Sequence, residues 1–169
     1  MTIEKIDPTL AHEMGEGYTL PAGKYFIGDP CYVFSNDDDN TDWHDVIELN
    51  TFDDPEFTAM LDGSPLAAYG TMYGDGVYGA KMTGPLSLRK RLSGMYPVDA
   101  GLIGVTNLDY FINGNGKMDY TLERLAELGD VVDVENSISI SIVPGEDNPD
   151  NFDHKIEFDG VVMTISTGD

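Results

Sequence analysis

Residues 24–34 join two apolar runs through the breaker Gly28-Asp29-Pro30. Aromatic and β-branched residues on both sides favour strands, whereas Gly28 frees the backbone and Pro30 fixes φ and removes a hydrogen-bond donor. A strand that bends at Asp29 is therefore expected. Because an unpaired buried charge is too costly, the Asp29 carboxylate should accept hydrogen bonds from nearby backbone N–H groups or lie exposed in a cleft.

The C-terminal part of the chain carries the clearest strand pattern. Residues 137–143 alternate serine with isoleucine, which is typical of a strand with one buried face. Residues 155–158 and 161–165 flank Asp159-Gly160, a dipeptide that favours a tight turn. We therefore predict an antiparallel hairpin over residues 155–167.

A second hairpin is predicted where residues 66–73 and 77–82 flank the turn signal Gly74-Asp75-Gly76. Residues 95–105 are interpreted as a further strand. Its glycines, Gly101 and Gly104, have no side chain, which is typical of places where another backbone comes close. These segments favour a mainly antiparallel sheet.

Three segments have helical patterns. Residues 42–50 repeat apolar side chains at helical spacing, residues 55–61 follow acidic residues, and residues 119–128 end before Gly129. Residues 1–17 alternate irregularly and are a candidate flexible arm. The predicted fold is α+β: a single domain over residues 1–169, with a curled or sandwich-like antiparallel sheet and two or three short helices.

Acidic residues dominate the charge of this chain. There are 31 Asp and Glu against 9 Lys and Arg, which gives a formal net charge of -22. Such a field repels nucleic acids and anionic membranes and attracts basic proteins or cations. Solubility or adaptation to a saline setting is the alternative explanation. The candidate partner-binding face is Asp37, Asp38, Asp39, Asp42, Asp45, Asp53, Asp54 and Glu56.

The single cysteine, Cys31, excludes an intramolecular disulfide framework, which suits a reducing cytosol. The first fifteen residues lack the apolar stretch of a signal peptide, so a cytoplasmic protein is expected. The histidines are scattered and match no zinc spacing, and two imperfect calcium-loop patterns are interpreted as turns. No cofactor, metal or catalytic residue is predicted, and Cys31 is predicted to be structural.

Three aspartates, Asp29, Asp75 and Asp99, lie in glycine-rich contexts and could gather around one cleft. The alternative is that each carboxylate only satisfies the N–H groups of its own turn. The basic residues of the Arg89-Lys90-Arg91 run could bind a phosphate there. The candidate ligand cleft comprises Asp29, Tyr32, Asp75, Tyr78, Arg89, Arg91, Tyr96 and Asp99.

Three motifs, Gly28-Asp29-Pro30-Cys31-Tyr32, Gly74-Asp75-Gly76-Val77-Tyr78 and Val98-Asp99-Ala100-Gly101-Leu102-Ile103-Gly104, resemble a group of small proteins of bacteria and their phages that has no established activity. The resemblance covers residues 18–105 and transfers no catalytic residue. It implies a small accessory protein.

The leading hypothesis is a non-enzymatic protein that binds and blocks a basic, nucleic-acid-binding surface of a host protein, in the manner of DNA-mimicking counter-defence inhibitors. Such a protein would work in the host cytosol. The alternative is a small-ligand or nucleotide-signal sequestering protein, and the third hypothesis is a hydrolase that uses one of the three aspartates.

Overall fold

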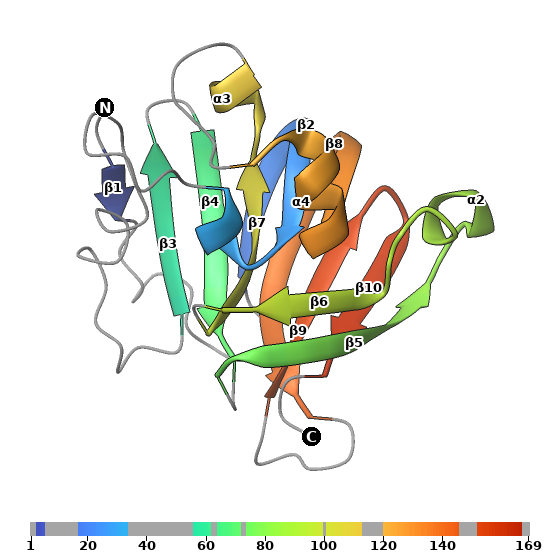
Figure 1. Cartoon of the computed structure of the whole chain (residues 1–169). Coiled ribbons are helices and arrows are strands. Elements are labelled where there is room, and N and C mark those ends of the chain that lie inside the picture. The colour runs from blue at the N-terminus through green and yellow to red at the C-terminus, as the bar shows by residue number, and fades with distance from the viewer. Residues whose placement is uncertain are drawn as a thin grey trace.

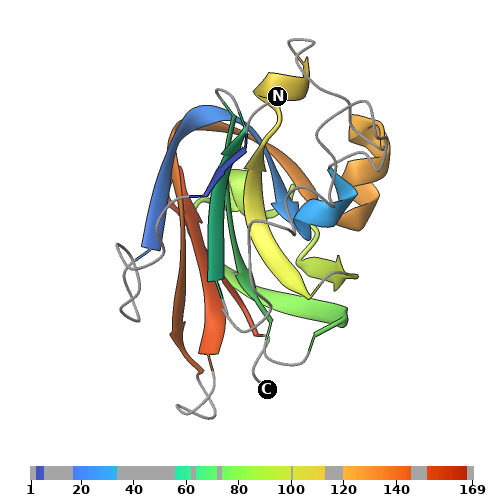
Figure 2. The same ribbon diagram turned by 90° about the vertical axis from the view of Figure 1, so that its left-hand side faces the viewer.

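The computed structural model describes residues 3–5, 17–33, 56–61, 64–71, 74–99, 101–112, 120–145 and 152–166. One antiparallel sheet of ten strands forms its centre and curls into a half-barrel (Figures 1 and 2). Its strands are β1 (Ile3–Lys5), β2 (Gly17–Gly28), β3 (Glu56–Leu61), β4 (Ser64–Gly70), β5 (Gly76–Thr83), β6 (Met95–Val98), β7 (Leu102–Asn107), β8 (Asp130–Pro144), β9 (Phe152–Phe158) and β10 (Val161–Ile165).

The strand order across the sheet is β1-β3-β4-β7-β2-β8-β9-β10-β5-β6, so β1 and β6 form its two edges. The longest ladder joins β2 to β8 and shifts register between Pro21 and Gly23. A bulge of this kind increases the local twist of a strand, which helps a wide sheet to curl.

The sheet buries side chains on both of its faces. The larger cluster holds alternate residues such as Tyr25 and Ile27 of β2, together with residues from β4 to β10. Phe26, which lies between them in the sequence, belongs to a smaller cluster on the opposite face. Successive strand residues point to opposite faces, so β2 serves both clusters.

In the part of the chain that the structure describes, four short helical segments accompany the sheet: the 3-10 helix η2 (Pro30–Tyr32) and the helices α2 (Leu86–Arg89), α3 (Asp109–Ile112) and α4 (Leu122–Leu128). Leu125 of α4 and Tyr32 of η2 belong to the smaller cluster. The side chain of Thr121 accepts a hydrogen bond from Arg124 N and caps α4, which confirms the predicted helix before Gly129.

The predicted α+β class is wrong, because the fold is mainly β. A helix is predicted over residues 55–61, but residues 56–61 form β3 and pair with both β1 and β4. Pairing with a strand on each side satisfies the backbone N–H and C=O groups of this segment. Such tertiary contacts override its weak local preference for a helix. The helix predicted over residues 42–50 lies outside the described residues, and three residues of the candidate N-terminal arm form β1.

The C-terminal hairpin is confirmed, with Val161 opposite Phe158 and Ile165 opposite His154. Its turn residues Asp159 and Gly160 both have positive φ, at 47° and 88°. Two-residue hairpin loops favour this geometry because its twist matches that of the strands. The Asp159 carboxylate also accepts hydrogen bonds from the backbone N–H groups of Glu135 and Asn136, so the turn is tied to β8.

The second predicted hairpin is wrong. β4 pairs with β3 and β7, whereas β5 pairs with β10 and β6, so the chain crosses between distant strands at Gly74-Asp75-Gly76. Two other strand predictions also fail locally. Residues 30–32 form η2, since Asp29 caps a turn there, and residues 95–105 divide into β6 and β7.

Candidate functional site

The loop of Asp29 and the loop of Asp99 are joined by one buried carboxylate. Asp29 is fully buried, and its Oδ1 accepts a hydrogen bond from Cys31 N over 3.0 Å. Its Oδ2 accepts another from Asp99 N over 2.9 Å, from a loop 70 residues away in sequence. The interpretation that Asp29 only satisfies its own turn is therefore too narrow, because its carboxylate also holds the loop of Asp99.

Tyr32 strengthens the same junction. Its hydroxyl donates a hydrogen bond to Asp99 Oδ2 over 2.5 Å. Burial raises the pKa of Tyr32, and the neighbouring Asp99 carboxylate raises it further. The phenol therefore stays protonated and donates, which holds Asp99 beside η2.

The third glycine-rich loop lies against the second. Thr71 N donates to Gly101 O over 2.9 Å, and a Cβ on Gly101 would lie 3.8 Å from the Cα of Gly74. Asp75 is exposed, and its charge helps to raise the pKa of Cys31. The structure therefore brings Asp29, Asp75 and Asp99 to one end of the sheet.

Cys31 lies among these carboxylates. Its thiol is half-buried, and burial is the main cause that raises its pKa. Asp29, Asp99 and Asp75 raise the pKa further, because a thiolate would be repelled by each of them. Its surroundings are therefore the opposite of the electropositive sites that make cysteines reactive.

We expect native Cys31 to react with a disulfide reagent at neutral pH at least about tenfold more slowly than the same cysteine in unfolded protein, since the thiolate is the reactive form. Stopped-flow absorbance after mixing with the reagent measures both rates. The variant Asp75→Asn serves as a comparison, because it removes one of the repelling charges and should speed the reaction modestly. Equal rates in folded and unfolded protein would contradict the structural role.

Among the described residues, a cation that the sequence analysis missed lies beside this junction. The rings of Tyr32 and Tyr120 lie 6.4 Å apart, and the guanidinium carbon of Arg124 lies 5.9 Å from the centre of the Tyr120 ring. Arg124 also forms an ion pair with Glu127 over 2.5 Å, one helical turn away on α4. The start of α4 thus places the ring of Tyr120 and the paired guanidinium of Arg124 beside Tyr32 of η2.

The basic residues predicted for the cleft lie elsewhere. Arg89 Nε donates to Gly84 O over 2.8 Å, next to α2, and Arg91 is exposed. The ribbon of β5 and β6 runs from the Asp75 end of the sheet to α2, so both arginines lie at its other end (Figure 1). They do not join the three aspartates.

Tyr78 and Tyr96 also take other partners. The Tyr78 hydroxyl donates to Gly74 O over 2.8 Å, which keeps it near the Asp75 turn. Tyr96 is fully buried, and its hydroxyl donates to Asp130 Oδ2 over 2.5 Å. Asp130 accepts a second hydrogen bond from Ser93 N, and burial raises the pKa of its carboxyl.

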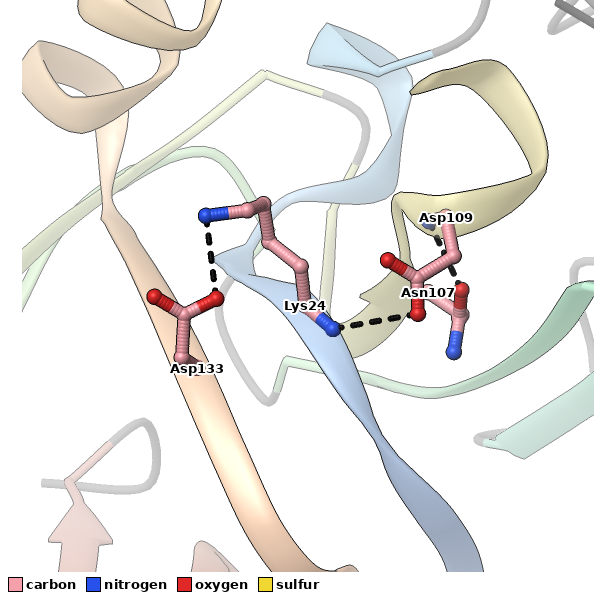
Figure 3. A network of polar contacts seen from close by, with 4 residues as sticks. All are labelled: Lys24, Asn107, Asp109 and Asp133. Carbon is pink, nitrogen blue, oxygen red and sulfur yellow. Dashed lines mark hydrogen bonds and ion pairs between the residues drawn. The ribbon is translucent and has the colours of Figure 1, made fainter. Parts of the chain in front are cut away.

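A second polar network joins β2, β8 and the start of α3 (Figure 3). The backbone N–H of Lys24 donates to Asp109 Oδ2 over 3.3 Å, while its ammonium pairs with Asp133 Oδ1 over 2.9 Å. Asn107 Oδ1 accepts from Asp109 N over 2.8 Å. A Cβ on Gly23 would lie 2.5 Å from Asp109 Oδ2, so the carboxylate packs directly on the β2 backbone. The network fastens the β2 bulge to its neighbours.

His154 is fully buried on the face of the larger cluster, whereas Cys31 packs against the smaller one. The two residues therefore do not form a nucleophile and base pair. His154 Nε2 lies 3.0 Å from the carbonyl oxygen of Tyr69, and a carbonyl only accepts, so Nε2 carries the proton. Since β4 and β9 are not neighbours in the sheet, this bond crosses the curled interior.

Burial lowers the pKa of His154 to about 4, from its usual 6.5. As the pH falls, the imidazole of the unfolded chain takes up a proton near pH 6.5, whereas the folded protein takes it up only near pH 4. Protonation therefore favours the unfolded chain, and the free energy of unfolding should fall between pH 6.5 and 4 by up to about 3 kcal/mol. The comparison is with His154→Gln, which keeps an amide donor and does not titrate. The difference in free energy of unfolding between the two proteins, measured in urea at several pH values, should shrink over this window. The titration of the carboxylates affects both proteins alike and cancels in this difference. A difference that stays constant over the pH range would contradict the prediction.

Seven residues of the predicted acidic face, Asp37, Asp38, Asp39, Asp42, Asp45, Asp53 and Asp54, lie outside the described residues, and Glu56 begins β3. Within the described part of the chain, no group of three or more His, Cys, Asp or Glu side chains is arranged to hold a metal ion. No helix among the described residues is long and apolar enough to cross a membrane. Comparison of the chain with protein-family models, curated proteins and solved structures finds no match.

Proposed function

We propose that this chain is a non-enzymatic accessory protein that binds a basic, nucleic-acid-binding surface of a host protein. The observation that carries the proposal is the net charge of -22 on a chain of 169 residues. A field of this size accelerates encounter with a basic surface and repels nucleic acid itself. Occupying the basic surface would exclude the nucleic acid that normally binds there.

The described side chains support a binding role better than a catalytic one. The carboxylates of Asp29 and Asp130 each accept two hydrogen bonds that hold loops together. The thiol of Cys31 is surrounded by negative charge, and His154 is enclosed in the core. A hydrolase would need a free base or nucleophile. Of its three candidate aspartates, Asp29 is fully buried and Asp99 accepts a hydrogen bond from Tyr32. The exposed Asp75 has neither Cys31 nor His154 available as a reactive partner.

The small-ligand alternative has less support. An anionic ligand such as a nucleotide would need cations beside the tyrosines, and Arg89 and Arg91 lie at the opposite end of the β5 and β6 ribbon. Among the described residues, Arg124 lies over the Tyr120 ring that neighbours Tyr32, and it is already paired with Glu127. The loops that gather at Asp29 are therefore better explained as a scaffold.

The test begins with a host lysate passed over the immobilised protein at low salt, followed by elution with rising salt. A basic protein recovered in this way is then bound to fluorescent duplex DNA, and our protein is added as competitor. We expect it to displace the DNA. A recovered partner that binds DNA and our protein at the same time, or the absence of any basic partner, would contradict the proposal.

The predicted acidic face is tested by changing Asp37, Asp38 and Asp39 together to asparagine. We expect the dissociation constant for the recovered partner to rise about tenfold, because each exposed charge pair contributes up to about 1 kcal/mol. The matched control neutralises Glu146, Asp147 and Asp150, which changes the net charge equally in another part of the sequence. Calorimetric titration at several salt concentrations measures both. Equal losses in the two variants would assign the effect to net charge and not to this face.

A further inference from the structure

Residues 76–98 form a basic arm on an acidic protein. This basic arm consists of β5, α2 and β6, and all 31 acidic residues of the chain lie outside it. It carries four of the nine cationic residues. They are Lys81, Arg89, Lys90 and Arg91. The cations of this segment are therefore separated from the acidic residues in sequence, although the Asp130 carboxylate contacts the arm at Ser93 N and the Tyr96 hydroxyl.

The basic arm also exposes large apolar side chains. Val77, Leu86 and Met95 have exposed fractions of 61%, 66% and 53%. Val77 lies opposite Pro97 in the ladder, and Met95 lies opposite Gly79 with its sulfur 3.6 Å from the place of a Gly79 Cβ. Exposed apolar groups bordered by charged residues are typical of interaction surfaces.

The free edge of the basic arm does not suit the addition of another strand. β6 is an edge strand, and Pro97 at its centre has no backbone N–H to offer. The N–H of Met95 donates to Ser93 Oγ over 3.3 Å. A partner therefore has to be recognised by the side chains of the arm and not by a main-chain ladder.

The length of the arm separates its tip from the aspartates at its base. β5 has 8 residues, and at about 3.4 Å per residue it spans about 27 Å. Charges in physiological salt are screened over about 8 Å, so the cations around α2 act almost independently of Asp75 and Asp99. Figure 1 shows α2 at the outer end of this ribbon.

We infer that the basic arm docks on the acidic body of a second copy of this chain. The rest of the chain supplies the complementary charge, because all 31 acidic residues lie outside positions 76–98 of the sequence. Two arms repel each other, so the contact joins arm to body. A reciprocal pair, in which each arm lies on the other copy, places both arms in one closed dimer.

This self-association is independent of the proposed function and is measured without a host partner. Sedimentation velocity over about 1 µM to 1 mM protein should show a reversible monomer–dimer equilibrium. Charge reversal by Arg89→Glu, Lys90→Glu and Arg91→Glu together should raise the dissociation constant at least about tenfold, since three attractions become repulsions. The matched control reverses Lys24, Arg124 and Lys155, which changes the net charge equally outside the arm and should have a smaller effect.

A second variant, Leu86→Ser, keeps all charges and should also weaken the dimer several-fold, because Leu86 is the most exposed large apolar residue of the arm. Carbodiimide crosslinking of mixed ¹⁴N and ¹⁵N protein should join Lys81 or Lys90 to carboxylates of the other isotope. Monomers over the whole concentration range, crosslinks that omit the arm, or equal weakening by the control would overturn the inference. So would binding of the arm to duplex DNA or to anionic vesicles by monomeric protein, since the arm would then serve another class of partner.

Discussion

Replacing Asp29 by alanine should lower the free energy of unfolding by about 3 kcal/mol or more, because hydrogen bonds to a charged group contribute about 1.5–3 kcal/mol each. Two such bonds end on this fully buried carboxylate, from Cys31 N and Asp99 N. The alanine would leave both N–H groups without their acceptor and would release the Asp99 loop from η2. Urea denaturation followed by fluorescence measures the loss.

Two further variants separate the causes. Asp29→Asn keeps one carbonyl oxygen and removes the charge. Its free energy of unfolding should therefore lie between those of the wild-type protein and the alanine variant. Asp75→Ala removes an exposed carboxylate of the neighbouring loop, and surface changes of this kind stay within about 0.5 kcal/mol. A loss below about 1 kcal/mol for Asp29→Ala would show that water replaces the carboxylate, and that Asp29 does not hold the two loops together.

Placing a side chain at Gly104 should have a comparable effect for a steric reason. Gly104 lies in β7 between β4 and β2, opposite Ala68 on one side and Gly28 on the other. A Cβ there would overlap Ala67 O and would lie 2.6 Å from Ala68 Cβ. The nearer atom belongs to the backbone of the next strand, so no rotamer change relieves the contact.

We expect Gly104→Ala to lose about 3 kcal/mol or more, at the upper end of what overpacking costs, and Gly104→Val to fold poorly if at all. The control is Gly79→Ala in exposed β5, where the nearest atom to a new Cβ is Met95 Sδ at an ordinary 3.6 Å. It should change stability by less than about 0.5 kcal/mol. Thermal unfolding of both alanine variants measures the difference, and a mild Gly104→Ala would show that β4 and β7 separate easily.

Local chemistry predicted several features of the fold from the sequence. The turn at Asp159-Gly160 needs positive φ at two adjacent residues, and this dipeptide tolerates it at small cost. Residues 122–128 form a helix because a capping threonine precedes them and a glycine follows. The role of Asp29 was also predicted in part, since a carboxylate between Gly28 and Pro30 had to find N–H donors or solvent.

Features that depend on distant partners were not predictable in this way. Residues 56–61 have no strong local preference, and they form a strand because β1 and β4 offer them backbone partners. The bond from Tyr96 to Asp130 joins residues 34 positions apart, and the contact of His154 with Tyr69 joins residues 85 positions apart. The sequence spacing of the two residues predicts neither contact, because each pair is brought together only by the curl of the sheet.

The sequence by itself determined the charge of this protein, including the absence of any acidic residue from positions 76–98. Only the tertiary structure decided what those charges do. It paired β5 with β6 and placed Arg89 and Arg91 at the end of the ribbon away from Asp75 and Asp99. Charge acts through space and is screened within about 8–10 Å, so its effect depends on which strands become neighbours, and long-range pairing sets those neighbours.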